Sequence, residues 1–452
     1  MPVETSPAGR TPSDCPQGWR EVPLGSVTDV RFSSVDKLTY GSEEPIRLCN
    51  YIEVYQNDYI TADLEFMRAS ATHAEIDRLG LQVGDVIITK DSEAPDDIGV
   101  PAVVDYAAPD LVCGYHLGLL RPKQTQVDPT FLSKQLGHHR LAHYFGRQAN
   151  GLTRYGLPIS AVTNAPIWLP HLTEQKTIGL LLRLVDEAIA TTEAVIAKLK
   201  QVHSGLLHDL LTRGLDADGQ LRDPIAHPEQ FKDSPLGTIP REWRICGVLD
   251  VAPPERQGIL TGPFGAQLGQ RDFVREGVPV LRIGNVQAGY IDWSDMQYVS
   301  PSKAVELTRF SVASGDLLFA RQGATTGRNA LADTRAVGAL INYHIIRVAV
   351  DRHLCEPVFL HALFNSESAR RQINRDKGRG TREGINTDQI ASLRFALPSI
   401  GEQRRAVAVL AEHAATESAE STALAKLNQF KCGLMADLLT GRVRVPENLE
   451  IG

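Results

Sequence analysis

The clearest hydrophobic pattern in the chain predicts one long helix over residues 169–213. Apolar or small residues recur three and four positions apart, which is the spacing of a heptad seam between two packed helices. Leu169-Pro170 favours an extended entry to this helix, and Arg213-Gly214 favours its end. A helix of about 40 residues is roughly 60 Å long, so we expect it to pack along a partner helix. The seam is predicted to consist of Ile178, Leu181, Val185, Ala188, Thr192, Val195, Leu199, Val202 and Leu206.

The partner helix is predicted in the same chain, over residues 397–442. Its Glu402-Gln403 repeats Glu174-Gln175 at an offset of 228 residues, and the flanking Leu-Pro and Leu-Leu-Thr motifs recur at the same offset. Ser399 and Glu402 predict a capping box, in which each side chain accepts a hydrogen bond from a free backbone N–H. The seam of this helix is less apolar than the first. Its predicted packing residues are Leu427, Phe430 and Leu434.

The repeat extends upstream of both helices and divides the chain into two similar halves. Tyr115-His116 recurs as Tyr343-His344 at the offset of 228, and Gly84-Asp85 recurs as Gly315-Asp316 at an offset of 231. A repeat of this length indicates a duplicated scaffold whose loops have diverged. Further matches pair Thr153-Arg154 with Thr381-Arg382 and Trp19-Arg20 with Trp243-Arg244.

Each half is predicted to carry a mixed α+β domain before its long helix. Short apolar runs bounded by Gly, Pro and Asp predict strands, and residues 131–148 and 357–374 predict helices. A stretch rich in Asp, Pro and Gly predicts a linker between the halves. The predicted divisions are a flexible N-terminus (1–15), a first domain (16–168), a helix (169–213), a linker (214–239), a second domain (240–396), a second helix (397–442) and a tail (443–452).

Charge is unevenly distributed along the 452 residues. The net charge of −7 argues mildly against a simple polyanion binder. However, no acidic residue lies between Pro129 and Thr173, and residues 370–382 carry many arginines against Asp376 alone. Because these basic segments occupy equivalent places in the two halves, their recurrence favours shared binding of something anionic. The competing interpretation is two solvated surfaces.

Cysteine usage and hydropathy bear on the compartment. The six cysteines are scattered without a C-x-x-C pair, so the sequence favours free thiols over disulfides or a zinc knuckle. No signal peptide and no apolar run of about 18 residues occur. We therefore expect a cytoplasmic protein without a membrane partner.

No motif for catalysis occurs in the sequence. It contains no phosphate-binding G-x-x-x-x-G-K-[ST], H-E-x-x-H or G-x-S-x-G motif, and the glycines at 262–269 have the wrong spacing for a dinucleotide loop. His138-His139 with His143 has helical i,i+4 spacing that could hold a metal, but a polar helix face near an anionic ligand explains these residues more simply. We therefore predict no catalytic residue and no metal site in this chain.

Polar residues on equivalent loops are the remaining candidates for binding. Arginine reads guanine, and asparagine or glutamine reads adenine, in the major groove of DNA. Lysine, serine and threonine suit phosphates, which position a protein without specifying sequence. Divergence of these loops between the halves is what two different half-sites require, although simple drift also produces it. The candidates are Arg47, Asn50 and Lys90 in the first half, and Arg282, Asn285, Gln287, Arg321, Gln322, Thr325 and Arg328 in the second.

The order of a variable domain, Leu-Pro-x-x-x-Glu-Gln, a long helix and Leu-Leu-Thr, repeated once, resembles the specificity subunit of type I DNA restriction–modification systems. The stretch 262–286 and the later 315–321 look like the target-recognition domains of that family. The resemblance covers roughly residues 16–442. Its weakest point is the second helix seam, which puts the detailed packing in doubt.

The resemblance implies a function without catalysis in this chain. Members bind double-stranded DNA, two methyltransferase subunits and, optionally, motor–nuclease subunits; the partners use S-adenosylmethionine, ATP and Mg²⁺. Each recognition domain reads one half of a bipartite, asymmetric target. The two helices pair antiparallel, relate the domains by a pseudo-two-fold and fix the gap between the half-sites. The same resemblance adds Gln267 to the candidates for the second half-site. It also implies contacts to DNA from Thr153, Arg154, Thr381 and Arg382 at the domain edges.

A second function class remains open on the sequence. A coiled-coil scaffold with two globular heads that binds only protein would show the same repeat. The paired basic segments discriminate between the two, because a pure scaffold does not need them. An enzyme with unrecognised chemistry is disfavoured, since no nucleophile with a base, metal set or cofactor loop recurs in the halves.

Overall fold

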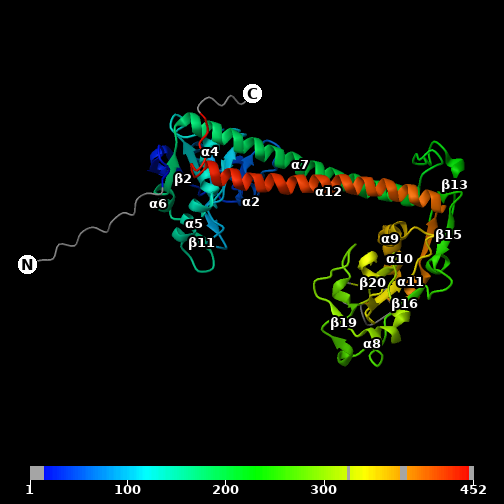
Figure 1. Ribbon diagram of the computed structural model, residues 1–452. Helices are drawn as coiled ribbons and strands as arrows, with labels where there is room; N and C mark the ends of the chain where they lie inside the picture. Colours follow the sequence, from blue (N-terminus) through cyan, green and yellow to red (C-terminus); the bar gives the residue numbers. More distant parts are fainter. Residues whose placement is uncertain (1–14, 323–325, 377–383, 447–452) are drawn as a thin grey trace, which may run out of the picture. The chain divides into compact units, whose positions relative to one another are not determined.

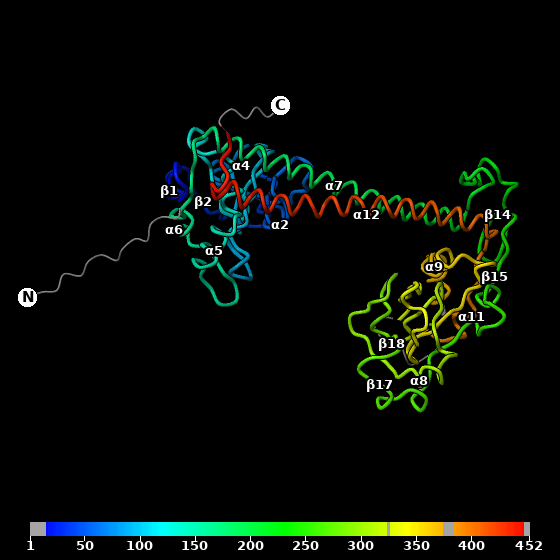
Figure 2. The backbone as a smooth tube through the Cα atoms, in the orientation of Figure 1, coloured from blue at the N-terminus to red at the C-terminus, as the bar shows by residue number. Residues whose placement is uncertain are grey.

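The computed structural model describes residues 15–322, 326–376 and 384–446, apart from the side chains of residues 374–376. The chain forms two compact units (Figure 1). Unit 1 comprises Met1–Ala194 and Ser421–Gly452, and unit 2 comprises Val195–Glu420. Early and late segments of the chain therefore share unit 1, where the blue and red parts of the trace lie together (Figure 2).

Two helices contribute to both units, namely α7 (Leu172–Thr212) and α12 (Ile400–Leu438). The other elements of unit 1 are β1 (Arg20–Pro23), α1 (Leu24–Val27), β2 (Thr28–Phe32), β3 (Glu44–Cys49), α2 (Tyr51–Gln56), β4 (Tyr59–Ile60), β5 (Met67–Ala71), α3 (His73–Leu79), β6 (Val86–Thr89), β7 (Asp91–Ser92), β8 (Pro101–Val104), β9 (Leu111–Cys113), β10 (Leu117–Pro122), α4 (Pro129–Gly137), α5 (His139–Gln148), β11 (Tyr155–Gly156), α6 (Ile159–Thr163) and β12 (Pro166–Leu169).

Those of unit 2 are β13 (Phe231–Lys232), β14 (Ile239–Pro240), β15 (Arg244–Gly247), β16 (Ile259–Thr261), β17 (Phe273–Val274), β18 (Val278–Leu281), β19 (Gln297–Val299), α8 (Pro301–Glu306), β20 (Leu317–Ala320), β21 (Asn329–Leu331), β22 (Leu340–Ile341), β23 (Ile345–Val348), α9 (Pro357–Asn365), α10 (Glu367–Asp376), α11 (Thr387–Ser392) and β24 (Arg394–Leu397). Short 3-10 turns, including one at Ile283–Asn285, connect some of them.

The strand after each Gly-Asp motif lies between two cores. In unit 1, β6 belongs to a five-stranded sheet of order β2-β10-β6-β8-β4. Val86 and Ile88 face one buried cluster and Ile87 faces another, because successive side chains point to opposite faces of a strand. In unit 2, β20 lies in the order β16-β23-β20-β21 and divides Leu317 and Leu318 between two cores in the same way. Both faces of these strands are covered, which explains their uninterrupted apolar sequences.

The long helices complete the cores of both units. In unit 1, Ile178 near the start of α7 shares a buried cluster with Leu438 at the end of α12. In unit 2, Leu210 near the end of α7 shares a cluster with Leu410 near the start of α12. The apolar seam therefore supplies core residues at both ends of each helix.

The packing face of α7 differs from the predicted face at alternate positions. Ile178 is buried as expected, and the predicted Leu181, Val185, Leu199 and Leu206 are partly buried. However, Leu182 and Ile196 are only 0% and 7% exposed, whereas the predicted Val195 and Val202 are 41% and 44% exposed. A heptad seam alternates steps of three and four residues. The prediction placed a three-residue step after Ile178, whereas the structure has a four-residue step there, to Leu182.

The second helix shows a related difference. Leu427 and Leu434 are partly buried, but Phe430 is 56% exposed. The next residue, Lys431, points inward instead and pairs with Asp186. A charged inward position was not expected from an apolar seam, and it displaces Phe430 to the surface.

Each predicted domain helix is broken once. The helix expected over residues 131–148 is two helices, α4 and α5, separated at His138, and the helix expected over 357–374 is α9 and α10, separated at Ser366. Both separating residues have extended backbone angles, with ψ of 141° at His138 and 157° at Ser366. The break therefore belongs to the duplicated scaffold, as His138 and Ser366 are also 228 residues apart.

Gln175 and Gln403 perform the same structural task in the two units. Gln175 accepts a hydrogen bond from the amide of Asp128 at 3.0 Å. Its Nε2 donates to the carbonyls of Gln126 and Pro170 at 3.2 and 3.0 Å. The exposed fractions of Gln175 and Gln403 are 1% and 0%. Gln403 makes the three equivalent bonds, to the amide of Glu356 and the carbonyls of Leu354 and Pro398.

Replacing Gln175 with alanine is expected to lower the free energy of unfolding of unit 1 by about 1–3 kcal/mol. The reason is that the amide of Asp128 and two carbonyls would remain buried without partners. Urea denaturation followed by hydrogen exchange of unit 1 peptides measures the loss. Gln403→Ala is the matched variant and should lower the free energy of unfolding of unit 2 by the same amount. Unchanged urea midpoints in both units would contradict a stabilising role for these glutamine hydrogen bonds.

A buried ion network holds the sheets of unit 1 against both long helices. Lys134 on α4 lies 2.6 Å from Asp186 on α7 and 2.9 Å from Asp58. Lys431 on α12 lies 2.7 and 2.9 Å from the same two carboxylates, and the Tyr59 hydroxyl donates to Asp186 at 2.8 Å. The side chains of Lys134 and Asp186 are 6% and 7% exposed. Burial alone would raise the pKa of Asp58, but the two lysines outweigh it and lower that pKa.

Glu402, at the start of α12, anchors the linker of unit 2. Its carboxylate accepts hydrogen bonds from Arg222 at 2.6 Å, the amide of Leu215 at 2.9 Å and the Trp243 indole at 3.2 Å. The predicted capping box is therefore only half correct. The Glu402 amide does donate to Ser399 Oγ at 3.3 Å, but its carboxylate turns to the linker instead.

Glu174 occupies the equivalent place in unit 1 and pairs with an arginine in the segment that follows α12. It lies 2.7 Å from Arg444, whose side chain is 47% exposed. Arg444 also donates to the carbonyl of Gln17 at 3.0 Å. The same glutamate of the repeat thus fixes the linker in one unit and joins early to late chain segments in the other.

Candidate nucleic-acid interface

In unit 1, aromatic and charged side chains gather where β6 ends and β10 begins. The Lys90 ammonium lies 4.5 Å from the centroid of the Tyr115 ring and 3.0 Å from Asp91 Oδ2. The same carboxylate oxygen lies 2.8 Å from Nδ1 of His116. Arg154 Nη2 lies 3.2 and 3.3 Å from the two ring nitrogens of His116. We call these five residues the Tyr115 cluster.

Backbone hydrogen bonds hold the Tyr115 cluster in place. The amide of Lys90 donates to the carbonyl of His116 at 3.0 Å, and the amide of Leu157 donates to the carbonyl of Lys90 at 2.8 Å. Tyr115 is 49% exposed, and Arg154 is also exposed. A fixed turn therefore presents an aromatic ring beside two cationic side chains, an arrangement that suits nucleic acid.

Unit 2 carries a counterpart at the equivalent place. The Tyr343 ring lies 3.7 Å from the His344 ring and 5.9 Å from the Phe264 ring, centroid to centroid. His344 Nδ1 lies 3.1 Å from the side-chain oxygen of Gln322. Burial, and then the nearby Arg321, lower the pKa of His344. We call Phe264, Arg321, Gln322, Tyr343 and His344 the Tyr343 cluster.

The two clusters share the backbone pattern that supports them. The amide of Arg321 donates to the carbonyl of His344 at 2.9 Å, as Lys90 does to His116. The amide of Ile385 donates to the carbonyl of Arg321 at 2.9 Å, as Leu157 does to Lys90. The supporting frame and its Tyr-His pair are thus duplicated, while neighbouring side chains differ, with Asp91 in one cluster and Gln322 in the other.

These clusters bring together some predicted residues and add others. Lys90 and Arg154 both belong to the Tyr115 cluster, and Arg321 and Gln322 both belong to the Tyr343 cluster. The aromatic residues and histidines were not predicted as site residues, although the recurrence of Tyr-His at the offset of 228 was a usable signal. The candidates were predicted from hydrogen bonds to bases and from contacts to phosphates, and contacts of aromatic and imidazole rings fall outside that chemistry.

Four other candidates make contacts within their own unit. Arg47 on β3 forms a two-bond contact with Asp110, at 2.9 and 2.7 Å, and this hydrogen bonding lowers the pKa of Asp110. Asn50 is 8% exposed and starts α2. Arg282 lies 2.7 Å from Asp295, and Asn285 donates to the Asp295 carbonyl at 3.2 Å. Their prediction as base-reading residues stays untested, but each must exchange an internal contact for one to DNA.

The remaining candidates are more open or lie outside the described residues. Gln267 is exposed, near Phe264 of the Tyr343 cluster. Arg328 is exposed and donates to the side chain of Gln287 at 3.1 Å. Thr325, Thr381 and Arg382 lie outside the residues that the structure describes.

Two of the four cations in the basic segment of unit 1, Lys134 and Arg140, make internal contacts, so only part of this segment is open for the predicted binding of an anion. Lys134 is buried in the ion network, and the Arg140 guanidinium lies 3.9 Å from the Trp168 ring centroid and donates to a backbone carbonyl. His138, expected on a polar face, is 7% exposed. Burial, followed by its charged neighbours, lowers the pKa of His138 to about 4, so it is neutral at pH 7. Arg147 and Arg154 are the exposed cations of this segment.

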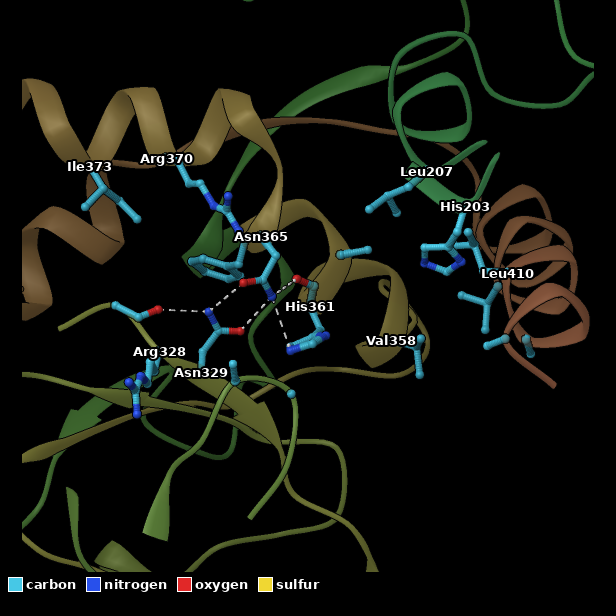
Figure 3. A pocket seen from close by; sticks show the side chains of 18 of the residues that line it. His203, Leu207, Arg328, Asn329, Val358, His361, Asn365, Arg370, Ile373 and Leu410 are labelled. Atoms are coloured by element: carbon cyan, nitrogen blue, oxygen red, sulfur yellow. Dashed lines mark hydrogen bonds between the residues drawn. The ribbon is translucent and has the colours of Figure 1, made fainter. Parts of the chain in front are cut away.

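A cavity of about 770 Å³ in unit 2 lies between the long helices and α9 (Figure 3). Asn365 and Asn329 bond each other across one wall, and Asn365 also donates to the carbonyl of His361 at 2.9 Å. Much of the remaining lining is apolar, including Leu207 and Leu410. The side chains of Asn329 and Asn365 thus satisfy each other, and burial lowers the pKa of His361. Ala362, Ala414 and His203 line the cavity where unit 1 has Lys134, Asp186 and Lys431.

Among residues 15–322, 326–376 and 384–446, no three His, Cys, Asp or Glu side chains are grouped to hold a metal ion. None of the helices described there has the length and apolarity needed to cross a membrane.

Comparison with known proteins identifies relatives along nearly the whole chain. The type I restriction enzyme EcoKI specificity subunit of Escherichia coli (strain K12) is 23% identical over 450 residues, which are 95% of this chain and 90% of that protein. The MjaVIII specificity subunit of Methanocaldococcus jannaschii is 23% identical over 285 residues, or 62% of this chain and 63% of that protein. The predicted resemblance to type I specificity subunits is confirmed. No protein-family model matches.

Solved structures agree with the predicted specificity-subunit fold. The S subunit of a type I restriction–modification system from M. genitalium has a TM-score of 0.55 at 13% identity, covering 96% of this chain and 99% of that one. A chain from a structure of the type I system has a TM-score of 0.54 at 17% identity, covering 96% and 100%. The α+β fold class, with two mixed domains and two long helices, is thereby confirmed.

Proposed function

We propose that this chain is the sequence-specific DNA-binding specificity subunit of a type I restriction–modification complex. It recognises a bipartite, asymmetric DNA target and directs adenine N6 methylation, and restriction, by partner subunits. The observation that carries the proposal is the duplicated frame bearing two different clusters. A shared frame suits one mode of docking on DNA, and different side chains suit two different half-sites.

The partners follow from the same proposal. Double-stranded DNA contacts the two clusters, and two methyltransferase subunits bind the chain, joined optionally by motor–nuclease subunits. The methyltransferase flips out the adenine and uses S-adenosylmethionine, while ATP and Mg²⁺ serve the motor–nuclease. This chain is non-catalytic and acts in the cytoplasm.

Deleting the gene for this chain is expected to abolish N6-methyladenine at one split, asymmetric motif. The reason is that the methyltransferase would lose the subunit that selects its sites. Methylome sequencing of cells carrying the gene and its methyltransferase, with and without the deletion, measures this. Restoring the gene on a plasmid is the control. An unchanged methylome, with the methyltransferase expressed and active, would instead favour a coiled-coil scaffold that binds only protein.

A further inference from the structure

We propose that Tyr115 in unit 1 and the Phe264–Tyr343 pair in unit 2 are specificity-determining aromatic contacts, each to the base pairs of a different half-site. This inference rests on the proposed function and names residues that it does not require. The ligand is duplex DNA, and the aromatic rings contact base edges while the neighbouring cations contact phosphates.

The exposure of these rings is the first argument. Tyr115 is 49% exposed and Phe264 is 61% exposed, although each lies against other aromatic or cationic side chains. Phe264 packs on the partly buried Tyr343, so the pair forms one projecting apolar surface. Rigid aromatic side chains contribute a large contact area and lose little conformational entropy on binding.

The support beneath the rings is the second argument. His116 lies against Tyr115, with ring centroids 4.9 Å apart, and is itself fixed by Asp91. Lys90 lies over the Tyr115 ring and is only 12% exposed, so its side chain is already ordered. A contact that is ordered before binding loses less free energy when DNA arrives.

The difference between the clusters is the third argument. Asp91 in unit 1 only accepts hydrogen bonds, as cytosine N4 requires of its partner, whereas Gln322 in unit 2 both donates and accepts, as adenine requires. Both residues directly follow a cation that comes immediately after a strand, Lys90 after β6 or Arg321 after β20. A common aromatic turn therefore positions two chemically different neighbours, which suits an asymmetric target.

Tyr115→Ala and Phe264→Ala should each relax one half of the target motif and leave the other half unchanged. We expect discrimination against single-base changes in the affected half to fall roughly tenfold, the size of one lost base contact. Methylome sequencing of cells carrying each full-length variant with its methyltransferase resolves the two halves separately. Tyr115→Phe keeps the ring and should keep the motif.

Tyr40→Ala is the matched control in unit 1. Tyr40 is 46% exposed but bonds the acidic Asp36 at 3.4 Å, so its loss should not alter the motif. Equal weakening of both halves by Tyr115→Ala, or no change in either half, would overturn the inference while leaving the proposed function standing. Absence of any motif dependent on the wild-type gene would overturn both.

Discussion

Replacing Asp186 with alanine is expected to lower the free energy of unfolding of unit 1 by about 3–5 kcal/mol. Asp186 is the carboxylate shared by Lys134 and Lys431, at 2.6 and 2.7 Å, and it also accepts from Tyr59. Without it, Lys134 would retain a full charge at a site that is 6% exposed, with Asp58 as its remaining partner. An unbalanced buried charge is far costlier than a lost surface ion pair.

Hydrogen exchange against urea concentration, read separately on peptides of the two units, measures this effect. Unit 1 should unfold at lower urea and unit 2 should not change. Glu187→Ala is the matched control, because Glu187 is the next residue on α7, is 57% exposed and pairs with Arg183 at the surface. A loss below about 1 kcal/mol for Asp186→Ala, equal to that of the control, would show that the network contributes no more than a surface pair.

Glu402→Ala should lower the free energy of unfolding of unit 2 by about 3 kcal/mol. The change leaves Arg222, 8% exposed, without its buried carboxylate and removes the acceptor of the Leu215 amide. We expect the lower end of the range for a broken buried pair, since Glu242 lies 3.7 Å from Arg222 and retains part of the attraction.

The duplication provides the control for this prediction. Glu174→Ala removes the equivalent glutamate, but its partner Arg444 is 47% exposed, so unit 1 should lose about 1 kcal/mol or less. The same urea series compares the two variants. Equal losses in both units would refute the argument that burial of the arginine sets the magnitude.

Local sequence patterns predicted the scaffold well. The repeat, the two long helices and the mixed domains follow from periodicity and motif spacing, which depend on neighbours in sequence. The seam was less well predicted, since steps of three and four residues fit either Leu181 or Leu182 as the next inward position. Choosing between them needs the partner surface, which periodicity does not supply.

Contacts between distant segments were not predicted. Lys134, Asp186 and Lys431 come from three helices, and nothing in the local sequence marks Lys134 as buried. From composition alone, Lys134 was therefore predicted to belong to an anion-binding segment. The candidate site shows the same limit. Lys90 and Arg154 were predicted as separate residues, and the fold is needed to show that they lie in one cluster with Tyr115 and His116.

The placement of the two Leu-Leu pairs has a consequence for a chain of half this length. Leu438 and Leu439 enter the core of unit 1, and Leu210 and Leu211 enter that of unit 2, so each core is closed by the helix that begins in the other unit. A polypeptide of half this length could not close its own core. It would need a second copy, and each copy would pack its last helical turn into the core of the other. The order of elements in the present chain is therefore that of two such copies joined into one polypeptide, with each half supplying the closing helical turn of the other half's core.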